Sequence, residues 1–148
     1  AEGLLTPAQV QALAAQPTSA DARFALGRHH LLRGEVEAAR RELAAARRLA
    51  PRDPDILLAH AVALAATPEP DCAWIAPTLE RALELGLDLS PNAPRGLALL
   101  ARCRARQDHW AEAGAAARAA LRYDPDNAAA REVLERVATA ERRVEPAP

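Results

Sequence analysis

The chain has 148 residues, of which 50% are hydrophobic but only 3% are aromatic, so its apolar content is mostly Ala and Leu. Because Ala and Leu are strong helix formers, this composition predicts an all-α protein. The net charge of −1 and the few aromatic side chains argue against nucleic-acid binding. No apolar run approaches the roughly 18 residues of a membrane span, so direct membrane insertion is not expected.

A short leading helix is predicted at about residues 6–15. Thr6, Pro7 and Gln9 have the spacing of a capping box with proline at the first helical position. Val10 and Leu13 then fall on one face, which we expect to pack inward.

Residues 20–53 are predicted to form a hairpin of two helices. Gly34 lies where the connecting turn needs a residue that tolerates a positive φ. Gly27 and Ala39 are small enough to let the paired helices approach closely, and His30 is expected to be buried or half-buried.

A stretched second hairpin is predicted at residues 54–93. Its first helix, from Pro54 to about Ala66, opens after Asp53 as N-cap. Since Pro77 would kink a helix begun at Cys72, we expect the regular part of the second helix to start at Pro77.

A third hairpin is predicted at residues 94–127, with Trp110 packed in the core at the start of its second helix. Asn127 is expected to cap a closing helix at about residues 128–142, followed by a tail at 143–148.

The hairpins share a pattern of small and large residues that resembles the tetratricopeptide repeat, over about residues 20–142. The resemblance implies one domain over residues 1–148, a right-handed α-solenoid of three hairpins with a leading and a capping helix. It also implies a protein-binding role rather than catalysis. The residues in register are Leu26, Gly27, His30, Ala39, Leu43 and Pro51 in the first copy, and Leu97, Leu100, Ala101, Ala113, Ala117, Ala120 and Pro125 in the third.

The middle copy also has sequence runs that indicate a more specific resemblance within the repeat class. The runs at residues 51–59, 77–83 and 90–100 are similar in order to the soluble domain of bacterial cytochrome c biogenesis factors. That resemblance implies a periplasmic, chaperone-like adaptor that holds unfolded apocytochrome c and presents it for haem ligation.

In the family, the first helix of each hairpin lines a concave groove that holds the ligand. The resemblance therefore implies a groove with an apolar end and a basic end. Arg102 and Arg106 are one turn apart and can address one carboxylate. The residues implied are Phe24, Arg28, Leu31, Leu58 and Val62 toward the first end, and Arg95, Arg102, Arg106 and Arg136 toward the second.

These residues have two other interpretations. The arginines could be an ordinary solvated helix face, neutralised by Asp108 and Glu112. A clamp for the terminal carboxylate of a partner is disfavoured, because relatives that use one place Lys and Asn in this groove and no Asn occurs at these positions.

No catalytic, cofactor or metal site is expected. The rings of His29 and His30, as neighbours on a helix, point about 100° apart and cannot chelate one ion on one face. His60 is isolated, and neither a nucleophile elbow nor a phosphate loop occurs. Trp74 is expected to anchor the Pro-rich segment onto the helices, with a partner contact as the alternative.

Cys72 and Cys103 are too few for a disulfide scaffold, so two buried or free thiols are expected. The alternative is one bridge, because the two helices concerned should run side by side; the Cα atoms would then lie within about 7 Å.

The functional hypothesis is an adaptor that binds a peptide or helical segment, with apocytochrome c as the candidate partner. The alternatives are a general scaffold in envelope, secretion or pilus assembly, and the targeting arm of a larger enzyme. The compartment stays open, with the periplasm favoured over the cytoplasm.

Overall fold

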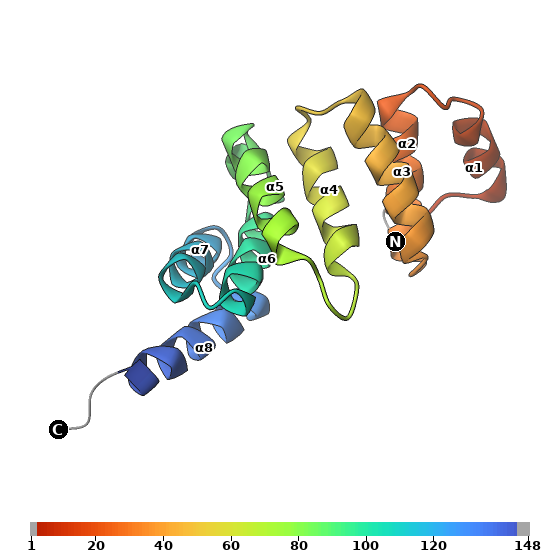
Figure 1. The fold of residues 1–148 in the computed structure, drawn as a ribbon. Helices are drawn as coiled ribbons and strands as arrows, with labels where there is room; N and C mark the ends of the chain where they lie inside the picture. The colour runs from red at the N-terminus through yellow and green to blue at the C-terminus, as the bar shows by residue number, and fades with distance from the viewer. Residues whose placement is uncertain (1–2, 145–148) are drawn as a thin grey trace. The chain divides into compact units, whose positions relative to one another are not determined.

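The computed structural model describes residues 3–144 and contains, in that range, eight α-helices, one short 3-10 helix and no strand (Figure 1). The all-α prediction is therefore confirmed. None of the helices in this part of the chain is long and apolar enough to cross a membrane. The elements are α1 Pro7–Ala14, α2 Ala20–Leu32, α3 Val36–Leu49, α4 Pro54–Ala65, α5 Cys72–Glu84, η1 Leu87–Leu89, α6 Ala93–Arg106, α7 Trp110–Tyr123 and α8 Ala128–Val144.

The residue contacts divide the chain into two compact units, Ala1–Asp71 and Cys72–Pro148. The boundary falls inside the predicted second hairpin, because α4 belongs to the first unit and α5 to the second. Each unit has one closely packed helix pair of its own, α2 with α3 in the first and α6 with α7 in the second.

The α2–α3 pair follows the predicted turn and spacing. Gly34 has a φ of 73°, and a Cβ there would meet nothing within 4 Å, so the turn needs glycine for its backbone conformation alone. Gly27 allows close helix contact, since a Cβ at this position would lie 2.5 Å from Leu43 Cγ. Both predictions are confirmed.

The segment before α2 is attached to it through a buried histidine. Thr6 and Gln9 form the predicted capping box of α1, which confirms it. The backbone N–H of Leu5 donates to Nδ1 of His29 at 3.0 Å, and His29 is only 5% exposed. The neighbouring His30 is half-buried, as predicted.

Helix α4 begins as predicted. The Asp53 carboxylate accepts hydrogen bonds from the backbone N–H groups of Asp55 and Ile56, at 2.9 and 3.2 Å, and Pro54 takes the first helical position, where no N–H is needed. The helix packs against α3 within the first unit.

A disulfide joins the first residue of α5 to α6. Cys72 and Cys103 are bonded, with a Cα–Cα distance of 5.2 Å, and both are buried. The expectation of free thiols is therefore wrong, and the alternative of one bridge holds. The physical reason is that α5 and α6 pack against each other in the second unit and bring the two side chains together.

The expected start of the regular helix at Pro77 is also wrong, because α5 begins at Cys72 with Pro77 inside it. The missing N–H of Pro77 leaves only the carbonyl of Ala73 without its helical donor. The buried side chains of Ile75 and Ala76 and the disulfide hold the first turn against this loss. Trp74 lies in that turn, inside a helix rather than in an irregular Pro-rich segment, and it is 46% exposed.

The second unit repeats the turn and cap of the first. Helices α7 and α8 start at residues 110 and 128, each 74 residues after α3 and α4. Asp108, 74 residues after Gly34, has a φ of 60°, which Asp tolerates better than most residues. Asn127 caps α8 as predicted, since its Oδ1 accepts from the N–H of Ala130 at 2.9 Å. Helix α8 runs two residues past the predicted end, and positions 145–148 of the predicted tail lie outside the described residues.

Candidate functional site

The predicted groove residues of α2 are partly committed to the core of the first unit. Phe24 and Leu31 are half-buried and pack against a buried cluster contributed by α3 and α4. Arg28 is exposed, and its guanidinium carbon lies 5.6 Å from the centre of the Phe24 ring, a cation–π distance. Helix α2 thus offers a guanidinium beside an apolar surface.

On α4 the two predicted residues differ in accessibility. Leu58 is only 4% exposed, so little of its side chain is available to a ligand, whereas Val62 is half-buried. Together with the three residues of α2 they belong to the first unit, and the other four predicted residues belong to the second.

Three arginines form a stripe along one face of α6. Arg102 and Arg106 are 7 and 11 residues beyond Arg95, and at about 100° per residue all three point within roughly 20° of the Arg95 direction. All three are exposed, and α6 has four arginines and no acidic residue. Within residues 3–144 none of the three forms an ion pair with a carboxylate.

The fourth arginine of α6, Arg104, is occupied inside the unit. It pairs with Glu80 of α5 and, through Nε at 3.1 Å, with Glu112 of α7, and its side chain is only 15% exposed. Glu112 is therefore engaged by Arg104 rather than neutralising Arg102 and Arg106. The stripe consequently keeps its positive charge at the surface.

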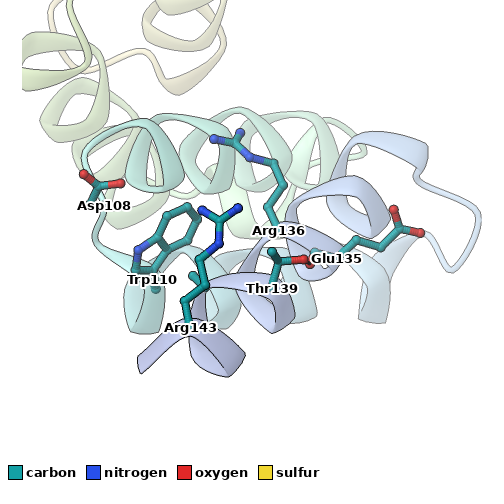
Figure 2. A pocket seen from close by; sticks show the side chains of 7 residues that line it. Asp108, Trp110, Glu135, Arg136, Thr139 and Arg143 are labelled. Atoms are coloured by element: carbon teal, nitrogen blue, oxygen red, sulfur yellow. Dashed lines mark hydrogen bonds between the residues drawn. The ribbon is translucent and has the colours of Figure 1, made fainter. Parts of the chain in front are cut away.

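A pocket of about 510 Å³ lies in the second unit, between the start of α7 and the C-terminal half of α8 (Figure 2). Trp110 forms one wall, and the guanidinium carbon of Arg136 lies 5.9 Å from the centre of its ring. Figure 2 shows Arg143 reaching toward the indole, while Glu135 is directed away from it. The pocket therefore combines an aromatic surface with two guanidinium groups.

The pocket shows that the predicted core position of Trp110 is wrong, and it adds Arg143 to the candidate binding residues. Trp110 was expected in the core, but it is half-buried and lines the pocket, because α8 covers only part of the indole. Arg143 was missed. Arg136, Thr139, Ala140 and Arg143 have the i, i+3, i+4, i+7 spacing of one helix face, and that signal could have indicated it.

The histidines serve structure at separate places. His60 is 4% exposed, and burial, followed by the charge of Arg47, lowers its pKa to about 4, so it is neutral at pH 7. His30 hydrogen-bonds to Glu35, which lowers the pKa of that carboxyl together with Arg33. Among the described residues, no three His, Cys, Asp or Glu side chains gather as a metal site would require.

Comparison with known proteins agrees with this architecture. Residues 10–63 match the family model described as "Tetratricopeptide repeat". No curated protein matches the sequence.

Solved structures share the fold at low sequence identity. The Arabidopsis OM64 TPR domain has a TM-score of 0.69 at 15% identity, over 84% of this chain and 98% of that one. The first TPR of Spaghetti (RPAP3), bound to an HSP90 peptide, has a TM-score of 0.68 at 14% identity, over 93% and 97%. The Yersinia enterocolitica type III secretion chaperone SycD, in complex with a peptide of the translocator YopD, has a TM-score of 0.60 at 16% identity, over 83% and 89%. Residues 10–63 therefore match the tetratricopeptide repeat family by sequence, and the chain shares the fold of solved tetratricopeptide repeat domains.

Proposed function

We propose that the chain is a polypeptide-binding adaptor rather than an enzyme, and that carboxylates of its ligand contact the exposed arginines of α6. The observation that carries the proposal is the arginine stripe of α6, three exposed guanidinium groups without a carboxylate partner in residues 3–144. Arg side chains pair bidentately with carboxylates, so a partner with acidic residues would satisfy them. The net charge of the whole chain is −1, so this positive surface is local.

The chemistry of the exposed residues narrows the ligand. The first unit supplies half-buried apolar side chains at Phe24, Leu31 and Val62, and the second supplies arginines. A polypeptide segment with several carboxylates would suit the arginines of the second unit, and a segment with an apolar face would suit the apolar side chains of the first. Two of the structures with this fold, those of Spaghetti and SycD, are complexes with peptides, which supports a peptide ligand here.

The test is a fluorescence anisotropy titration with a labelled synthetic helix that has a leucine face and a glutamate face. Arg102→Gln with Arg106→Gln should weaken binding about tenfold or more, since two charge-assisted contacts are lost. Arg118→Gln with Arg122→Gln is the matched control, because it removes the same charge from an exposed, equally spaced pair on α7. Equal losses in the two double variants, or no binding by the parent protein, would contradict the proposal.

For the identity of the partner we propose an apocytochrome c, held in the periplasm. Support comes from the resemblance of the middle copy to cytochrome c biogenesis factors and from the Cys72–Cys103 disulfide, since such bonds persist in oxidising compartments. A peptide from the C-terminal helix of an apocytochrome c should bind. Absence of binding at about tens of micromolar, roughly −6 kcal/mol, would count against this partner.

The second candidate is a scaffold or chaperone in secretion or envelope assembly, and the fold shared with SycD favours considering it. A pull-down from the native envelope separates the two, because a secretion role predicts export proteins in place of haem-pathway proteins. A targeting arm of a larger enzyme would show as a catalytic domain in the same reading frame.

A further inference from the structure

The pocket at the start of α7 has a tryptophan ring as one wall, and part of that ring is open to a ligand. Trp110 is the first residue of α7, and its half-buried indole leaves part of the ring open to the pocket. It is one of two tryptophans in the chain, and the other, Trp74, lies on α5. Aromatic surfaces of this kind stabilise contacts with large apolar side chains.

Two arginines of α8 bring positive charge to the indole. Arg136 and Arg143 are seven residues apart, about two turns or 10 Å along the axis, and lie on the same face of the helix. Neither forms an ion pair with a carboxylate of the described residues, although Asp108 and Glu135 line the same pocket. The neighbouring Arg142, by contrast, donates to Thr139 Oγ1 at 3.2 Å.

We infer that this pocket binds a carboxylate that is carried next to a large apolar side chain of a polypeptide. The carboxylate lies between the guanidinium groups of Arg136 and Arg143, and the apolar side chain packs on the open part of Trp110. Guanidinium groups beside an aromatic wall bind carboxylates more strongly than exposed ones do, because the wall excludes part of the solvent. The inference rests on the proposed function, in that the ligand is a polypeptide.

The charges of the pocket also predict which ligands it rejects. Glu135 is directed away from the indole, and Asp108 lies at the turn before α7 (Figure 2). A ligand that carries Lys beside its apolar residue would place its ammonium group against the two guanidinium groups that reach the indole. Such a ligand should bind more weakly than a neutral one.

The fluorescence of Trp110 provides a direct measurement. In a Trp74→Phe background Trp110 is the only indole, so its emission reports on this pocket alone. The probes are the acetylated tripeptides Glu-Leu-Glu, Gln-Leu-Gln and Lys-Leu-Lys as amides, and Gln-Leu-Gln as the free acid. The Glu amide should change the emission with at least tenfold higher affinity than the Gln amide. Tighter binding of the free acid than of the Gln amide would identify the terminus of a polypeptide as a second source of the carboxylate.

Two variants test which arginines are used. Arg143→Gln, at an exposed position in the last turn of α8, should weaken binding of the Glu amide about tenfold. Arg131→Gln is the matched control on the same helix, because Arg131 pairs with Asp126 outside the pocket, and it should change the affinity less than twofold.

The outcomes separate the pocket from the general function. If Lys-Leu-Lys binds best, or if both variants weaken binding equally, the pocket is not a carboxylate site and the inference is overturned. If the leucine–glutamate helix still binds through Arg102 and Arg106 while Trp110 emission never responds, the inference fails and the proposed function stands. If neither probe binds, both fail.

Discussion

Gly27 of α2 faces Leu43 of α3 so closely that a Cβ atom at Gly27 would lie 2.5 Å from Leu43 Cγ. In the other hairpin the positions 74 residues further on are Ala101 and Ala117, and both are fully buried. One helix pair therefore fills this contact with a glycine and a leucine, and the other fills it with two alanines.

This exchange predicts a coupling between the two positions. Gly27→Ala should lower the free energy of unfolding by about 1–3 kcal/mol through overpacking, and Leu43→Ala by about 2–5 kcal/mol through the cavity it leaves. The double variant recreates the alanine pair, so its loss in urea unfolding should be at least about 1 kcal/mol smaller than the sum of the single losses. If the losses in the free energy of unfolding are additive, positions 27 and 43 are not coupled, and an alanine pair cannot replace Gly27 and Leu43 at this contact.

The disulfide should stabilise the second unit. Cys72 and Cys103 are separated by 31 residues, and a closed loop of that size stabilises a fold by about 3–4 kcal/mol through the unfolded state. Replacing both residues by Ala should lower the urea midpoint accordingly. As a control, thiol titration of the denatured, unreduced protein should detect no thiol, and two thiols would contradict the structure.

His60 makes stability depend on pH. Its pKa is lowered from 6.5 to about 4 in the folded protein, first by burial and then by Arg47, Arg40 and Arg48. Between these values the unfolded protein binds a proton that the folded protein does not, so the free energy of unfolding falls as the pH drops from 6.5 toward 4. The loss between pH 7.5 and 5 should be about 2 kcal/mol from this residue.

The matched variant is His60→Leu, which keeps the position buried but cannot be protonated. Urea unfolding at the two pH values should show a loss about 2 kcal/mol smaller than in the parent protein, since all other titrating groups remain. An unchanged pH dependence would mean that His60 is accessible to solvent in the folded protein.

Arg104 and Arg102 should separate stability from binding. Arg104→Met removes the ion pairs with Glu80 and Glu112 from a mostly buried side chain, so unfolding should become about 1–3 kcal/mol easier. Arg102→Met changes an exposed side chain and should alter stability by no more than about 0.5 kcal/mol, while peptide affinity falls. Stability is measured by thermal unfolding and affinity by peptide titration. If Arg102→Met lowers stability more than Arg104→Met does, and Arg104→Met lowers peptide affinity more, the stripe is not the binding surface.

Local signals in the sequence predicted much of this fold. Three predicted N-caps, Thr6, Asp53 and Asn127, and the turn at Gly34 are present in the structure. They could be predicted because each depends only on residues within a few positions in the sequence. The all-α class and the repeat likewise follow from helix propensity and spacing.

Other features depend on tertiary packing, which spacing does not encode. Helix α5 passes through Pro77 because a disulfide and buried side chains hold its first turn. The engagement of Glu112 by Arg104, and the pocket beside Trp110, depend on which helix faces meet in the second unit. The exposure of the arginine stripe could be predicted from the sequence. That its arginines form no ion pair with a carboxylate in residues 3–144 could not.

The central claim is that this protein binds a polypeptide through the exposed arginine stripe of α6. The most direct test is backbone amide NMR during titration with the leucine–glutamate helix. We predict that the saturable shifts concentrate on α6, with Arg102 and Arg106 among the most affected, and that raising the salt concentration weakens the binding. Shifts confined to α3 and α7, or no saturable shift at all, would contradict the account.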